Sequence, residues 1–187
     1  MEYNGFEGDV NMITNETLKV LEERRSCRKF KPDMVDEECL QAILKAGTYA
    51  PTGMGKQSPI IIAITNKETR DELSRLNAMI MGKEGFDPFY GAPVICVVLA
   101  NKDARTYIYD GSLVAGNLMI AAQSVGVGSI WIHRAKEMFE TSEGKAILEK
   151  LGIEGEYEGI GNIALGYIDG PIQLAAPRKE NYIYWIR

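Results

Sequence analysis

The stretch from Gly111 to Ile132 contains no charged residue, in a chain of which 25% is charged. Such a stretch is long enough to span a bilayer as a single helix. However, Gly126-Val127-Gly128 interrupts it, and the polar residues Asn117 and Gln123 lie within it. We therefore expect a buried helix, followed by a buried strand that begins at Ser129, and no membrane span.

This uncharged helix also bears on assembly. A helix that is apolar around most of its circumference cannot face water on any side. In a chain of 187 residues, such a helix lies either at the centre of a single-chain core or against a partner subunit. The second arrangement predicts an obligate dimer. The residue pattern itself does not choose between the two.

The rest of the chain alternates between helical and extended patterns. This alternation predicts one α/β or α+β sheet domain over residues 1–187, in which residues 1–13 form an N-terminal arm and 171–187 a basic and aromatic extension. Residues 82–93 are predicted to be a loop over a surface or a site. Helices are expected at 14–25, 36–47, 67–79, from Asp110 onward and at 142–151, and strands at 60–64, 94–99, 129–132 and 160–168.

Composition excludes several classes of protein. The chain has 21 basic and 26 acidic residues, a net charge of −5, which argues against nucleic-acid binding because phosphate contacts require a basic surface. Three cysteines without a CxxC pair and a single histidine, His133, argue against a disulfide framework and a metal site. The first residues lack the apolar core of a signal peptide. We therefore expect a cytoplasmic protein.

One segment matches a dinucleotide-binding motif in its residues but not in its structural context. The segment Gly159-Ile160-Gly161-Asn162-Ile163-Ala164 matches the fingerprint, but an acidic segment precedes it and a strand-like run follows. The fingerprint must instead follow a strand and open a helix, because its glycines bring the backbone and a helix N-terminus to the pyrophosphate. We therefore do not expect a dinucleotide site there.

A cationic segment is the strongest candidate for a binding site. Residues 24–31 hold five Arg or Lys among eight residues, with Ser26 between them. Such a run is consistent with a solvated helix end, which gains from the helix dipole, or with a polybasic targeting signal. It is equally consistent with an anion site, because guanidinium groups and hydroxyls bind phosphate well.

Five motifs stand in order along the chain: Arg24-x-Ser26-x-Arg28-x-Phe30; Ala50-Pro51-Thr52 with Gln57; Gly91-Ala92-Pro93; Asp110, Asn117, Ala121 and Ala122 followed by Gly126-Val127-Gly128; and Pro177-Arg178-Lys179. Together they resemble the FMN-dependent nitroreductases, over about residues 14–180. In the loop after Pro51, this chain lacks the Asn and the Trp of the family pattern.

The resemblance implies an α+β fold with a central antiparallel-type sheet flanked by helices, in an intertwined homodimer that holds two FMN molecules at its interface. Arg24 and Ser26 would bind the phosphate and the ribityl chain, and Arg28 would lie nearer to the ring. The implied cofactor-binding residues are Arg24, Arg25, Ser26 and Arg28; Pro51, Thr52, Gly53 and Gln57, with Pro51 to Gly53 supplied by the partner; Ile132 and His133 at the flavin edge; and Arg178 and Lys179 at the phosphate.

The same resemblance implies a function. An FMN-dependent oxidoreductase of this family passes electrons from NADH or NADPH through flavin N5 to a small acceptor, such as a nitroaromatic or a quinone, by a ping-pong mechanism. No catalytic side chain is expected because the cofactor carries the chemistry, and Arg28 would stabilise the negative charge of the reduced ring. Two alternatives remain open at this point: a non-catalytic flavin carrier, and a dehalogenase or flavin-cleaving relative on the same fold.

Overall fold

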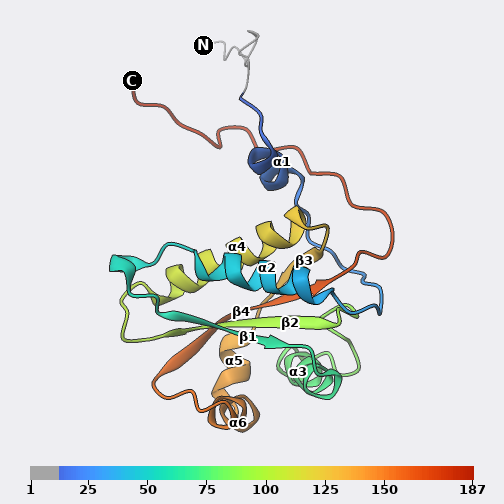
Figure 1. Ribbon diagram of the computed structural model, residues 1–187, viewed down its shortest axis with the longest axis vertical. Coiled ribbons are helices and arrows are strands. Elements are labelled where there is room, and N and C mark those ends of the chain that lie inside the picture. The colour runs from blue at the N-terminus through green and yellow to red at the C-terminus, as the bar shows by residue number, and fades with distance from the viewer. Residues whose placement is uncertain (1–12) are drawn as a thin grey trace.

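The computed structural model describes residues 13–187 and contains a four-stranded antiparallel sheet between two layers of helices (Figure 1). The spatial order of the strands is β1-β2-β4-β3, so that β2 and β4 lie at the centre. The strands are β1 (Pro59–Ile64), β2 (Val94–Asn101), β3 (Gly128–Ile132) and β4 (Tyr157–Gly166).

Helices cover both faces of the sheet (Figure 1). One face carries α2 (Glu37–Thr48) and α4 (Tyr107–Ser124), and α1 (Glu16–Glu23) packs on α4. The other face carries α3 (Lys67–Ile80), α5 (Ala135–Glu140) and α6 (Ser142–Lys150). A short 3-10 turn, Gly53–Gly55, precedes β1.

Burial on both faces explains the sequence of β2. Each residue from Val94 to Ala100 is fully buried. Because successive side chains of a strand point to opposite faces, Ile95, Val97 and Leu99 pack in the core beside α3 and α5, and their neighbours pack in the core beside α2 and α4. A strand with two covered faces has no polar position, which accounts for its continuous apolar run.

Helix α4 is buried on one side only. Val114, Ala115 and Leu118 pack in the core between α4, α2 and the sheet. On its outer side, Tyr109 is 72% exposed and Leu113 is 47% exposed. Within residues 13–187, the chain therefore leaves an apolar side of this helix uncovered.

The structure confirms the expected class, an antiparallel sheet with flanking helices, and corrects some boundaries. The first helix is capped by Asn15 rather than Thr14, because Asn15 Oδ1 accepts a hydrogen bond from the N–H of Leu18. Helix α4 begins at Tyr107, before Asp110. Helix α5 was not expected, since its six residues are too few for a helical period to show.

Three further expectations concern the N-terminal arm, the end of the final strand and a membrane span. The expected N-terminal arm, residues 1–13, lies outside the described residues except for its last position. The final strand ends at Gly166 instead of 168. In the part of the chain that the structure describes, no helix has the length and apolar character needed to cross a bilayer.

The glycines of the false dinucleotide motif serve packing inside β4. A Cβ atom on Gly159 would lie 2.2 Å from the carbonyl oxygen of Ala135. A Cβ atom on Gly161 would lie 2.7 Å from the ring of Trp131. Both glycines therefore permit a close approach between β4 and its neighbours, and neither begins a helix.

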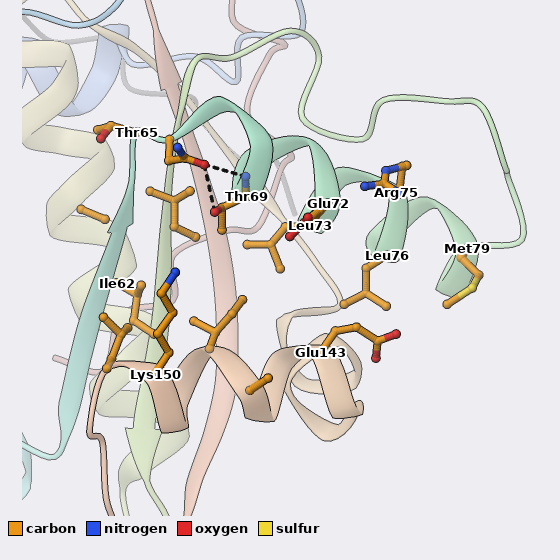
Figure 2. A pocket seen from close by; sticks show the side chains of 16 residues that line it. Ile62, Thr65, Thr69, Glu72, Leu73, Arg75, Leu76, Met79, Glu143 and Lys150 are labelled. Atoms are coloured by element: carbon orange, nitrogen blue, oxygen red, sulfur yellow. Dashed lines mark hydrogen bonds between the residues drawn. The ribbon is translucent and has the colours of Figure 1, made fainter.

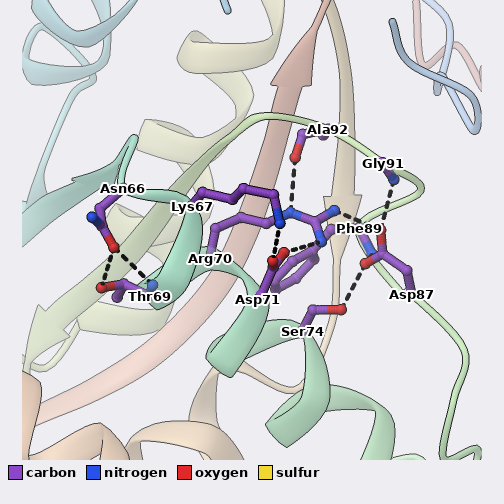
Figure 3. A network of polar contacts seen from close by, with 10 residues as sticks. All are labelled: Asn66, Lys67, Thr69, Arg70, Asp71, Ser74, Asp87, Phe89, Gly91 and Ala92. Atoms are coloured by element: carbon purple, nitrogen blue, oxygen red, sulfur yellow. Dashed lines mark hydrogen bonds and ion pairs between the residues drawn. The ribbon is translucent and has the colours of Figure 1, made fainter. Parts of the chain in front are cut away.

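A polar network joins α3 to the loop that precedes β2 (Figure 3). Arg70 is buried, and its Nε donates to the carbonyl oxygen of Ala92 at 2.9 Å. Its Nη2 pairs with the carboxylate of Asp87, and its guanidinium carbon lies 5.5 Å from the centre of the Phe89 ring. One side chain thus holds three points of the loop.

Asp87 completes the network from within the loop. Its carboxylate accepts hydrogen bonds from Ser74 Oγ at 2.6 Å and from the N–H of Gly91 at 2.7 Å. Burial raises the pKa of Asp87, but these hydrogen bonds and the bond from Arg70 outweigh burial and hold the pKa below its ordinary value of 3.8. The ionised carboxylate is therefore the form that the fold stabilises.

The lowered pKa of Asp87 predicts a pH-dependent contribution to stability. The contribution is complete above the unfolded-state pKa and is lost as the pH falls through the lower folded-state pKa. Asp87→Asn should lower the free energy of unfolding at neutral pH by about 1.5–3 kcal/mol, the range for hydrogen bonds to a charged group. In strong acid, the variant and the wild type should converge. Urea denaturation across the pH range measures the difference.

Glu156→Gln is the control for this prediction, because Glu156 forms an exposed ion pair with Lys102. Its effect on the free energy of unfolding should be much smaller. An equal loss of stability for Asp87→Asn at neutral and strongly acidic pH would contradict the assigned role of the ionised carboxylate.

Candidate functional site

The cationic segment lies along the end of the sheet. The N–H of Cys27 donates to the carbonyl oxygen of Ser129 at 3.0 Å, at the beginning of β3. The N–H of Lys31 donates to the carbonyl oxygen of Tyr167 at 2.8 Å, just after β4. The segment therefore crosses from one strand to the other, and its backbone is fixed at both ends.

The arginines of this segment have unsatisfied donors. Arg24, Arg25 and Ser26 are half-buried, and Arg28 is exposed. Arg25 Nη1 donates to the carbonyl oxygens of Glu22 and Arg24, at the end of α1. Arg24 Nη1 and Arg25 Nε are buried and have no hydrogen-bond partner among residues 13–187. A buried, unpaired guanidinium N–H is costly, and an anionic oxygen is the partner that satisfies it best.

The cysteine within the segment is not a nucleophile. The buried thiol of Cys27 donates to the carbonyl oxygen of Lys29 at 3.0 Å. Burial raises the pKa of this thiol, and the hydrogen bond to Lys29 only partly offsets the effect. Burial likewise raises the pKa of Cys96 to about 12. Both thiols are therefore protonated at neutral pH, and the reactive form of cysteine is the thiolate.

The end of β3 carries the next pair of predicted residues. Ile132 is buried and His133 is exposed. Ser129, which pairs with the cationic segment, lies in the same strand as Ile132, three residues and about 10 Å away at ~3.3 Å per residue. The strand therefore joins the Arg24–Arg28 segment to the Ile132–His133 turn as one rigid unit.

The loop after Pro51 is held at the N-terminal end of α4 by a buried carboxylate. Asp110, in the first turn of α4, accepts hydrogen bonds from the N–H of Gly53 at 3.0 Å and from Ser58 Oγ at 2.9 Å. Thr106 Oγ1 also donates to it, at 3.0 Å. A Cβ atom on Gly53 would lie 2.2 Å from Thr106 Oγ1, so only glycine fits there.

Two of the four predicted residues of this loop face a hollow of about 740 Å³. Thr52 and Gln57 line it, together with residues of α2 and β1. The N–H of Gln57 donates to Thr52 Oγ1 at 3.0 Å, which closes the loop on itself. Pro51 and Gln57 are exposed.

Helix α4 separates the two predicted segments within one chain. The loop is anchored at its first turn. Strand β3 begins just after its last turn, and the cationic segment pairs with the start of that strand. A helix of 18 residues is about 27 Å long at 1.5 Å per residue. Figure 1 shows the loop before β1 and the segment after α1 at opposite ends of this helix. A single chain therefore does not bring the two segments together.

The predicted C-terminal anchors, Arg178 and Lys179, contact other residues of the C-terminal extension. Arg178 and Lys179 are exposed. Arg178 Nη2 donates to the carbonyl oxygen of Ala176, and Lys179 Nζ lies 5.2 Å from the centre of the Tyr182 ring. Their contacts are thus made within the extension itself.

A larger groove lies on the opposite face of the sheet (Figure 2). It has a volume of about 790 Å³ and is bordered by β1, α3 and α6. Its floor is apolar, with Leu73 and Leu76 on α3, and charged side chains such as Arg75 and Lys150 lie toward its rim. None of the predicted cofactor-binding residues lines it, so size alone does not locate the site.

Comparison with known proteins decides the family. A family model described as the Nitroreductase family matches residues 21–167. The chain belongs to the nitroreductase family. The matched region of this nitroreductase includes the cationic segment, the loop after Pro51, α4 and the end of β3. It holds four of the five motifs that carry the resemblance, and Pro177-Arg178-Lys179 lies beyond it.

Similar structures and relatives agree with this assignment. An FMN-bound nitroreductase from Bacteroides fragilis is 27% identical, with a TM-score of 0.85 over 93% of this chain and 100% of that one. An FMN-bound nitroreductase from Desulfitobacterium hafniense is 30% identical, with a TM-score of 0.82 over 92% and 99%. A protein of Archaeoglobus fulgidus that bears the name of an NADH dehydrogenase or NAD(P)H nitroreductase is 29% identical over 81% of this chain and 85% of that protein.

Three buried polar residues of this nitroreductase were not predicted as part of the site. Asp110 anchors the loop after Pro51. In the sequence it is a lone acidic residue just before the uncharged stretch, and it belongs to one of the family motifs. Asn77 and Asn162 hold the end of β3. Asn162 stands within an apolar strand, and a polar residue there is a signal that sequence analysis could have used.

Proposed function

We propose that this chain is an FMN-dependent oxidoreductase that takes electrons from NADH or NADPH and passes them to a small acceptor. The observation that carries the proposal is the pair of buried, unpaired guanidinium nitrogens on Arg24 and Arg25. Anionic oxygens of a phosphate would satisfy both, and Ser26 would add a hydroxyl donor beside them. The FMN-bound relatives and the family assignment support this choice of anion.

The cationic segment favours FMN over FAD. FMN ends in a single phosphate, which one cluster of cations can bind. The adenylate half of FAD requires a further site, and the only dinucleotide-like motif of the sequence lies inside β4.

The side chains would orient the cofactor and supply charge, whereas the flavin supplies the two-electron chemistry when bound. Arg24, at the end of α1, would fix the phosphate end. Arg28 is exposed and lies four residues farther along the segment, so it can reach the ring. A fixed cation there stabilises the negative charge that reduction places on the ring. No side-chain acid or base is required.

A homodimer is part of the proposal. A second copy would cover the outer, apolar side of α4, where Tyr109 and Leu113 are exposed. A two-fold axis beside this helix would also bring the Pro51–Gly53 loop of one copy toward the Arg24–Arg28 segment of the other. The aromatic extension, which ends in Tyr182-Ile183-Tyr184-Trp185-Ile186, would likewise gain from burial against a second copy. The three free cysteines are consistent with a reducing compartment, such as the cytoplasm.

One prediction of the proposed function concerns the cofactor and its turnover. Protein purified without added flavin should release FMN on heating, as identified by chromatography against FMN and FAD standards. Anaerobic NADH or NADPH should bleach its visible absorbance, and a nitroaromatic or a quinone should restore it. Release of FAD would contradict the FMN assignment. Retained FMN that neither donor bleaches would contradict the oxidoreductase assignment and indicate a flavin carrier.

Another prediction separates the roles of two arginines. Arg24→Ala should weaken FMN binding by about 1.5–3 kcal/mol, the range for hydrogen bonds to a charged group. Arg28→Ala should instead lower the midpoint potential of bound FMN by about 30 mV, which corresponds to ~1.4 kcal/mol for a two-electron couple. Titration calorimetry and spectroelectrochemistry on FMN-saturated protein measure the two effects.

Arg75→Ala is the matched control, because Arg75 is exposed on the groove beside α3, away from the cationic segment. It should change neither the affinity nor the potential. An unchanged potential in Arg28→Ala would show that Arg28 does not act on the ring. Unchanged FMN affinity in Arg24→Ala would remove the phosphate site from the proposal.

A further inference from the structure

Two buried asparagines converge on the turn that follows β3. Asn77, on α3, donates from Nδ2 to the carbonyl oxygen of His133 at 2.9 Å. Asn162, on β4, donates from Nδ2 to the carbonyl oxygens of His133 at 3.2 Å and Ile132 at 3.3 Å. Both asparagines are fully buried. Two consecutive carbonyl groups are thus drawn into the interior by two different elements.

Arg134 extends this network. Its backbone is left-handed, with φ at 75°, and it precedes the first residue of α5. Its Nε donates to Asn77 Oδ1 at 3.0 Å, so the amide of Asn77 is satisfied on both sides. The turn from β3 to α5 is therefore held from its backbone and from a side chain.

The inward carbonyls determine where the amide protons point. In a trans peptide, the C=O of one residue and the N–H of the next point in opposite directions, and no described peptide bond is cis. Because the carbonyls of Ile132 and His133 both face Asn162, the N–H groups of His133 and Arg134 both face away from it. That direction is the outer edge of the sheet, because β3 is an edge strand and Asn162 lies on its neighbour β4. A regular strand would instead alternate the two directions.

The polar atoms of Asn162 indicate that it has a role besides stability. Its Oδ1 is buried without a hydrogen-bond partner among the described residues. An unpaired buried carbonyl oxygen costs free energy, and an apolar side chain in this strand would avoid that cost. The same side chain donates from Nδ2 to the carbonyl oxygens of Ile132 and His133, and these contacts accompany the cost.

We propose that Asn77 and Asn162 are positioning residues, which turn the N–H groups of His133 and Arg134 toward the FMN ring as a pair of hydrogen-bond donors. This inference rests on the proposed function, because it requires FMN beside the end of β3. The asparagines themselves do not touch the cofactor. They act through the backbone that they hold.

Residue-resolved amide hydrogen exchange tests the inference on the full chain, with and without saturating FMN. In the wild type, FMN should slow exchange at His133 and Arg134. In Asn162→Ala, this slowing should fall at least tenfold at His133, because the Ile132 carbonyl is released and the N–H of His133 loses its fixed direction. The effect at Arg134 should be smaller, because Asn77 still holds the His133 carbonyl. Asn162→Ser keeps one donor and should give an intermediate slowing. If the alanine variant does not fold, Asn162→Ser and Asn77→Ser provide the same comparison.

Asn66→Ala is the matched control. It removes an asparagine that caps the other end of α3, where Asn66 Oδ1 accepts from the N–H of Thr69 at 2.9 Å. It should lower the melting temperature but leave the FMN-dependent slowing at His133 and Arg134 intact. Loss of that slowing in the control as well would show that general stability, rather than position, sets it, and would overturn the inference.

Two further outcomes separate this inference from the function on which it rests. If FMN slows exchange at Ser26 and Arg28 but not at His133 and Arg134 of the wild type, the proposed function stands and the positioning role is wrong. Equal slowing in the wild type and in all asparagine variants also overturns the positioning role alone. If FMN slows exchange nowhere in the wild type, the proposed function fails, and the inference fails with it.

Discussion

The burial of α4 is the constraint on which the rest of this structure depends. One side of the helix packs against the sheet and α2, which fixes its position along the whole face. Its two ends then set the positions of the two segments that carry the predicted cofactor-binding residues: the loop after Pro51 at its first turn, and β3 with the cationic segment after its last. A rigid helix about 27 Å long keeps these segments apart in one chain.

Buried polar side chains fix the backbone at each of these segments. Asp110 holds the loop through Gly53, and Asn77 and Asn162 hold the end of β3. Arg70 performs the same task for the loop before β2. None of these groups has to react with a substrate. Their shared task is to hold backbone groups in fixed directions, which is what the protein contributes when a cofactor performs the chemistry.

Most of the fold could be predicted from the sequence, because its strands are apolar runs, helices α2 and α3 show helical periodicity, and α4 is marked by the absence of charge. The buried strand β2 and the uncharged helix α4 are the plainest cases. Helix α5 was not predicted because six residues are too few to show a helical period. The role of Asn162 was not predicted because its hydrogen-bond partners lie far away in the sequence. The site residues were reached through family motifs, and the separation of the two segments appears only in three dimensions.

The central claim is that residues of two chains complete one FMN site, and FMN stoichiometry in a mixed dimer tests it most directly. Arg24→Ala impairs the cationic segment, and Gly53→Val displaces the loop through its clash with Thr106. Each variant alone should fold and dimerise but bind FMN weakly. Dimers co-purified with one copy of each should regain one tight FMN per dimer, because one intact segment meets one intact loop. Mixed dimers that bind FMN no better than either variant alone would contradict a site shared between chains.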